Sequence, residues 1–256
     1  MLRSSFPLVL ALAPALVAGC GEDGREPEPE EATAEIETIP FADRALPVGG
    51  HALVSEAGDT IRFLVRRAED RAYLELVQRR TGPAGADSVA ALIDPDTKEP
   101  VASYHRRFTE EGDTLVARVA YGTGFEGQAR LSITAPGADV DDNLRTPDPV
   151  LDAAQIPQTL SALRFGRPDT IPFNYVAPFE REALAGRLLV GRPDTLRIDG
   201  ASISAWRVDL QAGGLEERYW FSTAPDPYRL IRFREITRDR TWTRVGAADA
   251  AEEGPS

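Results

Sequence analysis

Apolar and polar residues alternate with a period of two through most of the chain between residues 41 and 245. In the stretch 115–121, Leu115 and Val119 fall on one face of an extended strand and Arg118 on the other. Such alternation is typical of antiparallel strands with one face in water, and about a dozen segments with sandwich-like or barrel-like spacing predict a mainly β domain. The pattern recurs at 129–133, 206–210 and 231–234.

Short turn sequences separate these segments. Gly or Pro followed by Asp favours a turn, and the β-branched Thr that follows favours the start of a strand. The pentapeptide GRPDT occurs twice, at 166–170 and 191–195. Because the flanking residues do not align, we interpret it as a turn sequence that recurs in a β-rich chain; an internal repeat is the alternative. Including these two copies, which contain Arg167 and Arg192, the Asp-Thr turn is used four times; the other two begin at Gly58 and Gly112.

One stretch departs from the alternation. Residues 151–165 combine spaced apolar positions with Ala and Gln and are divided by Pro157, which predicts a short helix near 158–164. The preceding residues 135–149 are rich in Asp, Pro and Gly, and we expect a loop there. The order of segments favours one large curved antiparallel sheet around a short central helix; two β-halves joined near 137–165 are the alternative.

The last part of the β region predicts three consecutive antiparallel strands, with sequences AWRVDL, RYWFS and RLIRF. Alternation places Trp206, Val208, Ile231 and Phe233 on one side of that sheet. If the sheet encloses an apolar ligand, the aromatic side chains expected to line the site are Trp206, Trp220 and Phe233.

The first twenty residues have the layout of a secretory signal: Arg3, an apolar run and small residues before Cys20. The ending LVAGC resembles the lipobox of bacterial lipoproteins, which implies a signal peptide at 1–19 and a diacylglycerol and acyl modification on Cys20. An ordinary signal peptide is the alternative. Gly21 follows in place of Asp, which by the same resemblance implies the outer membrane, facing the periplasm.

Charge is concentrated at the ends of the chain. Of the net charge of −12, the eight acids and one Arg of residues 22–37 contribute −7. We expect residues 20–40 to be a disordered tether, 41–245 to be one β-rich domain, and 246–256 to be a disordered acidic tail. The domain itself is nearly neutral and shows no basic patch, which argues against nucleic acid as a partner.

The segment 87–236 has a recognisable order of motifs: TLSALRF, PDTIPFNYVAPFE, then AWRVDL, YWFS and RLIRF. It resembles a domain family of unknown function from bacterial envelope proteins. The resemblance implies a half-barrel like that of the periplasmic lipoprotein carrier and its outer-membrane receptor. No counterpart of the receptor's protruding insertion loop is found in this sequence.

Candidates for catalysis are few. His51 and His105 are the only histidines, and their spacing matches no zinc motif, so we expect strand-surface histidines. The carboxylates of 139–143 could hold calcium but lack the pattern of an EF-hand, so a solvated loop is expected. We interpret the arginines of RRTG and HRRF as charged residues at strand ends rather than as phosphate sites.

The sequence therefore predicts a non-enzymatic, lipid-anchored lipoprotein of the cell envelope that has no metal or cofactor beyond the lipid on Cys20. Its half-barrel would bind an apolar ligand such as an acyl chain. The alternative is a structural or assembly lipoprotein that docks another envelope protein. The expected partners are the membrane, through the anchor, and a lipid or an envelope protein.

Overall fold

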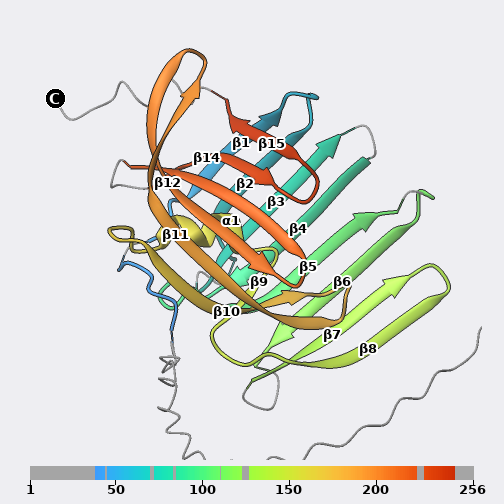
Figure 1. Cartoon of the computed structure of the whole chain (residues 1–256). Coiled ribbons are helices and arrows are strands. Elements are labelled where there is room, and N and C mark those ends of the chain that lie inside the picture. The colour runs from blue at the N-terminus through green and yellow to red at the C-terminus, as the bar shows by residue number, and fades with distance from the viewer. Residues whose placement is uncertain are drawn as a thin grey trace, which may run out of the picture. The chain divides into compact units, whose positions relative to one another are not determined.

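The alternating segments pair in chain order to form one large curved sheet (Figure 1). The computed structural model describes residues 38–43, 45–69, 72–82, 85–109, 111–122, 127–223 and 228–245. Cys20, the expected signal peptide, the part of the expected tether before residue 38 and the expected tail after residue 245 lie outside the described residues. No helix within these ranges is long and apolar enough to cross a membrane.

Eight strands form the first half of the sheet. They are β1 (Gly49–Ser55), β2 (Thr60–Arg67), β3 (Leu74–Gly82), β4 (Gly85–Ile93), β5 (Pro100–Phe108), β6 (Thr114–Tyr121), β7 (Gln128–Ala135) and β8 (Ala138–Arg145). The second half begins with β9 (Val150–Asp152), α1 (Ile156–Thr159) and the 3-10 helix η1 (Leu160–Ala162). It continues with β10 (Asp169–Ala177), β11 (Glu182–Ile198), β12 (Ala201–Ala212), β13 (Leu215–Ser222), β14 (Leu230–Glu235) and β15 (Arg240–Arg244).

The order across the sheet is β8 to β1, then β15 down to β9, so the first and last strands of the domain pair at its centre. Neighbouring strands are antiparallel except β9 and β10, which are parallel. The sheet curves without closing, with β8 and β9 at its two edges. The predicted mainly β fold, a curved half-barrel with one short helix, is confirmed.

The short helical segment fills the hollow of the sheet (Figure 1). Ile156, Leu160 and Leu163 are almost completely buried in the main core, together with the inward side chains of β1, β2 and β10 to β15. Pro157 lies in the first turn of α1, where its missing N–H costs nothing. The helix therefore begins around this proline, slightly before the predicted start at 158.

Two predictions from turn residues are wrong. Residues 138–145 form the edge strand β8, because Val140 and Leu144 supply an inward face and the acids lie at an edge where water solvates them. The second GRPDT is inside β11, where the pairing with β12 shifts register between Val190 and Pro193. It forms a bulge, which admits a proline into a paired strand.

The expected inner face of the last strands is also partly wrong. Trp206, Val208 and Phe233 do face the main core. However, Trp220 pairs with Arg232 and Phe221 with Leu230, so a bulge at Ile231 turns that side chain to the opposite face. There Ile231 and Trp220 pack with Leu196 and Ile203 of the β11–β12 hairpin.

A buried carboxylate on the edge strand β9 contacts β5 and β6, which lie toward the other edge of the sheet. Asp152, on β9, is fully buried, and its Oδ1 lies 2.9 Å from Nε2 of His105 on β5. Its Oδ2 accepts hydrogen bonds of 2.5 Å from Ser103 and from Tyr121. Oδ1 also accepts the backbone N–H of Ala154 at 2.8 Å. We call these four side chains the Asp152 clamp.

Burial by itself would raise the pKa of Asp152, but the interactions with His105, Ser103 and Tyr121 outweigh burial and hold the pKa below its usual value. The carboxylate is therefore ionised at neutral pH. His105 is buried, so the expectation of a strand-surface histidine is wrong. The alternation of apolar and polar residues could not predict this burial, because the face of β5 that carries His105 is covered by β9, a strand distant in the sequence.

Substitution of Asp152 by Asn should lower the free energy of unfolding by about 3–5 kcal/mol, because the remaining donors lose their charged acceptor in a dry site. Urea denaturation of the Asp152→Asn chain measures this. Asp142→Asn is the matched control, because Asp142 is exposed and its partner Arg181 stays solvated. Equal midpoints for the two variants would contradict a stabilising role for the clamp.

Candidate functional site

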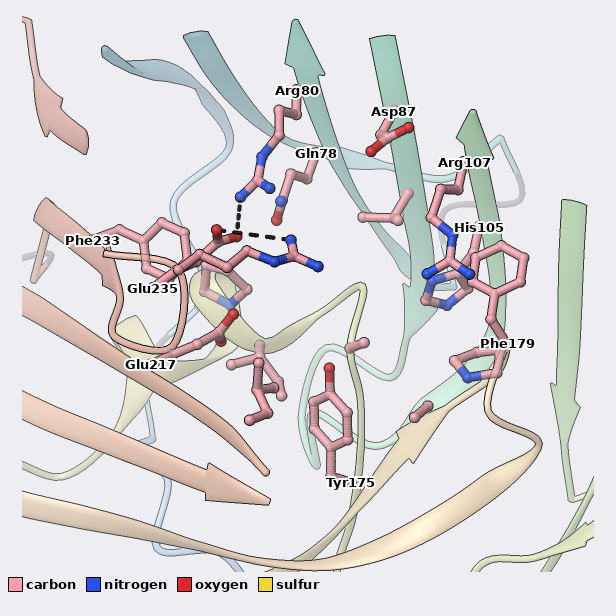
Figure 2. Close-up of a pocket in the computed structure, with 18 of the residues that line it drawn as sticks. Gln78, Arg80, Asp87, His105, Arg107, Tyr175, Phe179, Glu217, Phe233 and Glu235 are labelled. Atoms are coloured by element: carbon pink, nitrogen blue, oxygen red, sulfur yellow. Dashed lines mark hydrogen bonds and ion pairs between the residues drawn. The ribbon is translucent and has the colours of Figure 1, made fainter. Parts of the chain in front are cut away.

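A cavity of about 470 Å³ lies on the concave side of the sheet, next to α1 (Figure 2). Its walls come from the inward side chains of β2 to β5 on one side and of β10, β13 and β14 on the other. Ile156 and Pro157 of α1 contribute to the lining. The curvature of the sheet thus creates the cavity, and the helix limits its extent.

Much of the lining is apolar and aromatic. The ring of Phe233 stacks between Tyr219, at 5.0 Å between centroids, and Trp242, at 5.3 Å. Tyr219 pairs directly with Phe233, and Phe233 with Trp242, on neighbouring strands, so the rings are cross-strand neighbours in contact. The other main apolar side chains of the lining are Phe63, Val89, Ile156, Phe179 and Leu215.

One wall of the cavity carries a charged group of residues. Glu235 is buried and forms an ion pair with Arg80, and its second oxygen lies 3.9 Å from Arg238 (Figure 2). The Arg80 guanidinium also lies over the Trp242 ring, 4.7 Å from its centroid. Glu217 lies on β13 directly opposite Glu235 and accepts a hydrogen bond from the Tyr219 hydroxyl.

These two facing carboxyl groups have different surroundings. Burial raises the pKa of Glu217 from 4.5 to about 7; the Tyr219 hydrogen bond opposes the rise and the negative charge of Glu235 adds to it. Glu235 instead lies within ion-pair distance of Arg80 and Arg238. Two facing carboxylates would repel each other, which favours a proton on Glu217.

The opposite rim is built by β5 and the end of β10. The Arg107 guanidinium lies over the Phe179 ring, 4.4 Å from its centroid. Tyr175 points its hydroxyl into the cavity, and Gln78 extends toward it from β3 (Figure 2). Within the described ranges, neither Tyr175 nor Gln78 has a side-chain hydrogen bond to protein, so both are available to a bound molecule.

The structure separates the three aromatic residues expected to line a ligand site. Phe233 lines the cavity. Trp206 instead is partly buried against the main core, where it stacks on Phe165 with ring centroids 5.6 Å apart. Trp220 lies on the other face, where its indole N–H donates to Asp194 at 3.4 Å, because strand alternation places it between the inward residues Tyr219 and Phe221. Cys20 lies outside the described residues.

Sequence reasoning missed the polar residues of the cavity, although the alternation contained a signal for two of them. Glu217 is in phase with Tyr219 and Phe221, and Glu235 is in phase with Phe233. A charged residue on the apolar face of a strand must be buried or line a cavity. For Arg80 and Tyr175 no comparable signal exists, because their neighbours come from distant strands.

No group of three or more His, Cys, Asp or Glu side chains in the described part of the chain is placed to hold a metal ion. The residues 139–143, considered above for calcium, alternate between the two faces of β8, and Asp142 pairs with Arg181. His51 stacks on Phe63 at 5.0 Å. The cavity combines an apolar floor with a polar rim.

The raised pKa of Glu217 makes the stability of the domain depend on pH. The folded chain retains a proton between pH 4.5, where the unfolded carboxyl titrates, and about pH 7, so stability should fall as the pH rises through this window. Glu217→Gln removes the titration and should flatten the dependence of the urea midpoint on pH. An equally steep fall in the Gln variant would contradict this assignment.

Comparison of the chain with protein-family models, with curated proteins and with solved structures finds no match.

Proposed function

We propose that this chain is a lipid-anchored binding protein of the cell envelope, non-enzymatic, whose concave cavity holds the apolar part of a ligand such as an acyl chain. The observation that carries the proposal is the cavity itself, with its floor of Phe63, Val89, Tyr219 and Phe233. Its volume of about 470 Å³ is in the usual range for small-molecule sites.

The polar side chains without protein partners narrow the kind of ligand. A purely apolar molecule would cover the Tyr175 hydroxyl and the Gln78 amide without giving them hydrogen-bond partners, which costs free energy. A ligand with both an apolar part and a polar group avoids that cost. We therefore propose an amphipathic ligand rather than a bare hydrocarbon, which refines the expectation from the sequence.

The lipid anchor supports a location of the binding protein in the cell envelope. The LVAGC motif places a lipid on Cys20, and the acidic segment 22–37 would hold the domain away from the membrane surface. We propose the periplasmic face of the outer membrane, because Gly21 follows the cysteine. The membrane is then the first partner, and the near-neutral domain is unsuited to nucleic acid.

Docking of another envelope protein is the second candidate. One feature favours it: Leu64 and Val48 are 38% and 63% exposed, and Leu64 lines a second hollow of about 460 Å³ together with Phe63 and Val77. Exposed apolar side chains can mark an interface, but Val48 lies outside the lining of this hollow.

Native mass spectrometry of the full chain, purified from an envelope extract, tests ligand binding. We expect a co-purifying amphiphile, lost in Val89→Trp, which fills the cavity. Ala90→Trp is the control, because Ala90 lies on the other face of β4. Unchanged occupancy in Val89→Trp, or no amphiphile on the wild-type chain, would argue against the proposal.

The lipid anchor has its own test. Cells grown with a fatty-acid analogue should label the wild-type chain but not Cys20→Ser, because the Ser hydroxyl is a poor nucleophile toward the lipid donor. Label retained by the Ser variant would show that Cys20 is not the modified residue.

A further inference from the structure

We propose that Arg107, at the rim of the cavity, is an anion-binding subsite, so that the ligand is an amphipathic anion with a carboxylate or phosphate head. This inference rests on the proposed function and adds the chemistry of the head group to it. The apolar part would extend from the rim over Val89 and Tyr175 toward the aromatic floor.

The first support is that Arg107 has no carboxylate partner. Arg80 and Arg238, the other arginines among the described lining residues, both interact with Glu235. No ion pair within the described ranges involves Arg107, whose contact is the Phe179 ring under its guanidinium. A guanidinium stacked in this way keeps its N–H edge free and fixed in orientation, which suits two-pronged binding of a carboxylate or phosphate.

The second support is a pair of neutral donors that line the same cavity as Arg107. The hydroxyl of Tyr175 and the amide of Gln78 project into the same cavity (Figure 2). Burial, with the nearby charge of Glu217, raises the pKa of Tyr175 well above 10, so the hydroxyl keeps its proton. Such donors can solvate an anionic head that has left water.

The charged wall does not offer an equivalent place for a cationic head. Glu235 is already neutralised by two arginines, and Glu217 holds a proton below about pH 7. Of the acids nearer Arg107, Asp87 accepts the backbone N–H of Phe108 at 3.0 Å, and Glu180 is exposed to water. Among the described arginines that line the cavity, Arg107 is therefore the one without an ion-pair partner.

The arrangement also matches the shape of an amphiphile. Arg107 is exposed at the end of β5, so a charged head bound there stays partly in water. The apolar surface lies farther inside, which is where an acyl chain gains from burial.

Calorimetric titration of the full chain in a Cys20→Ser background tests the subsite. The probes, all below their micelle concentrations, are dodecanoate, dodecyl phosphate, the neutral monoglyceride of dodecanoate, and inorganic phosphate. We expect the two anionic amphiphiles to bind about tenfold or more tightly than the monoglyceride, as hydrogen bonds to a charged group imply. Inorganic phosphate should bind much more weakly, because it lacks the chain.

Arg107→Gln should reduce binding of both anionic amphiphiles to the level of the monoglyceride and leave monoglyceride binding unchanged, which also shows that the variant is folded. Arg106→Gln is the matched control, since Arg106 lies over Phe108 instead of lining the cavity.

The subsite is refuted if the wild-type chain binds monoglyceride as tightly as the anions, or if the two Gln variants behave alike. Phosphate binding as tight as that of dodecyl phosphate would indicate a free-anion site and overturn the amphipathic ligand. Failure of every amphiphile to bind would instead refute the proposed function.

Discussion

The curvature of this sheet depends on a buried, ionised carboxylate. Asp152 lies on β9, the last strand in the order across the sheet, and its partners Ser103, His105 and Tyr121 lie on β5 and β6, near the other end. Burying a charge is costly unless several donors satisfy it. The clamp supplies those donors only if the two ends approach, so the sheet must bend around whatever lies between them.

What lies between them is the short helical segment and, next to it, an unfilled space. Ile156, Leu160 and Leu163 are completely packed, whereas the region between β3–β5 and β13–β14 has no side chain large enough to fill it. His105 belongs to both features, because it bonds Asp152 and lines the cavity. The constraint that bends the sheet therefore also forms one wall of the candidate site.

The cavity contains both charged and apolar side chains, and most of its charged side chains interact with other residues of the cavity wall. Glu235 interacts with Arg80 and Arg238, the pKa of Glu217 is raised to about 7, and Arg80 also covers the Trp242 ring. Arg107 remains outside this network at the rim. The buried acids of the cavity wall thus have partners within the protein, as the cost of burying an unpaired charge requires.

The sequence alone determined the architecture, because alternation depends only on which residues are adjacent in the chain. It predicted the strands, the short helix near 158–164 and the inward positions of Val208 and Phe233, all of which the structure contains. The alternation also indicates that Glu217 and Glu235 lie on the same strand face as buried aromatic residues, which the prediction did not use.

The tertiary structure alone decided the register and the site. The bulge at Ile231 turned that side chain and left Leu230 inward, and the second GRPDT became a bulge inside β11. Both outcomes depend on pairing between strands, which local turn preferences do not specify. His105 and Arg107 acquired their surroundings from β9 and the end of β10, segments more than forty residues away in the chain. A linear pattern records which face a residue occupies, but only packing decides what covers that face.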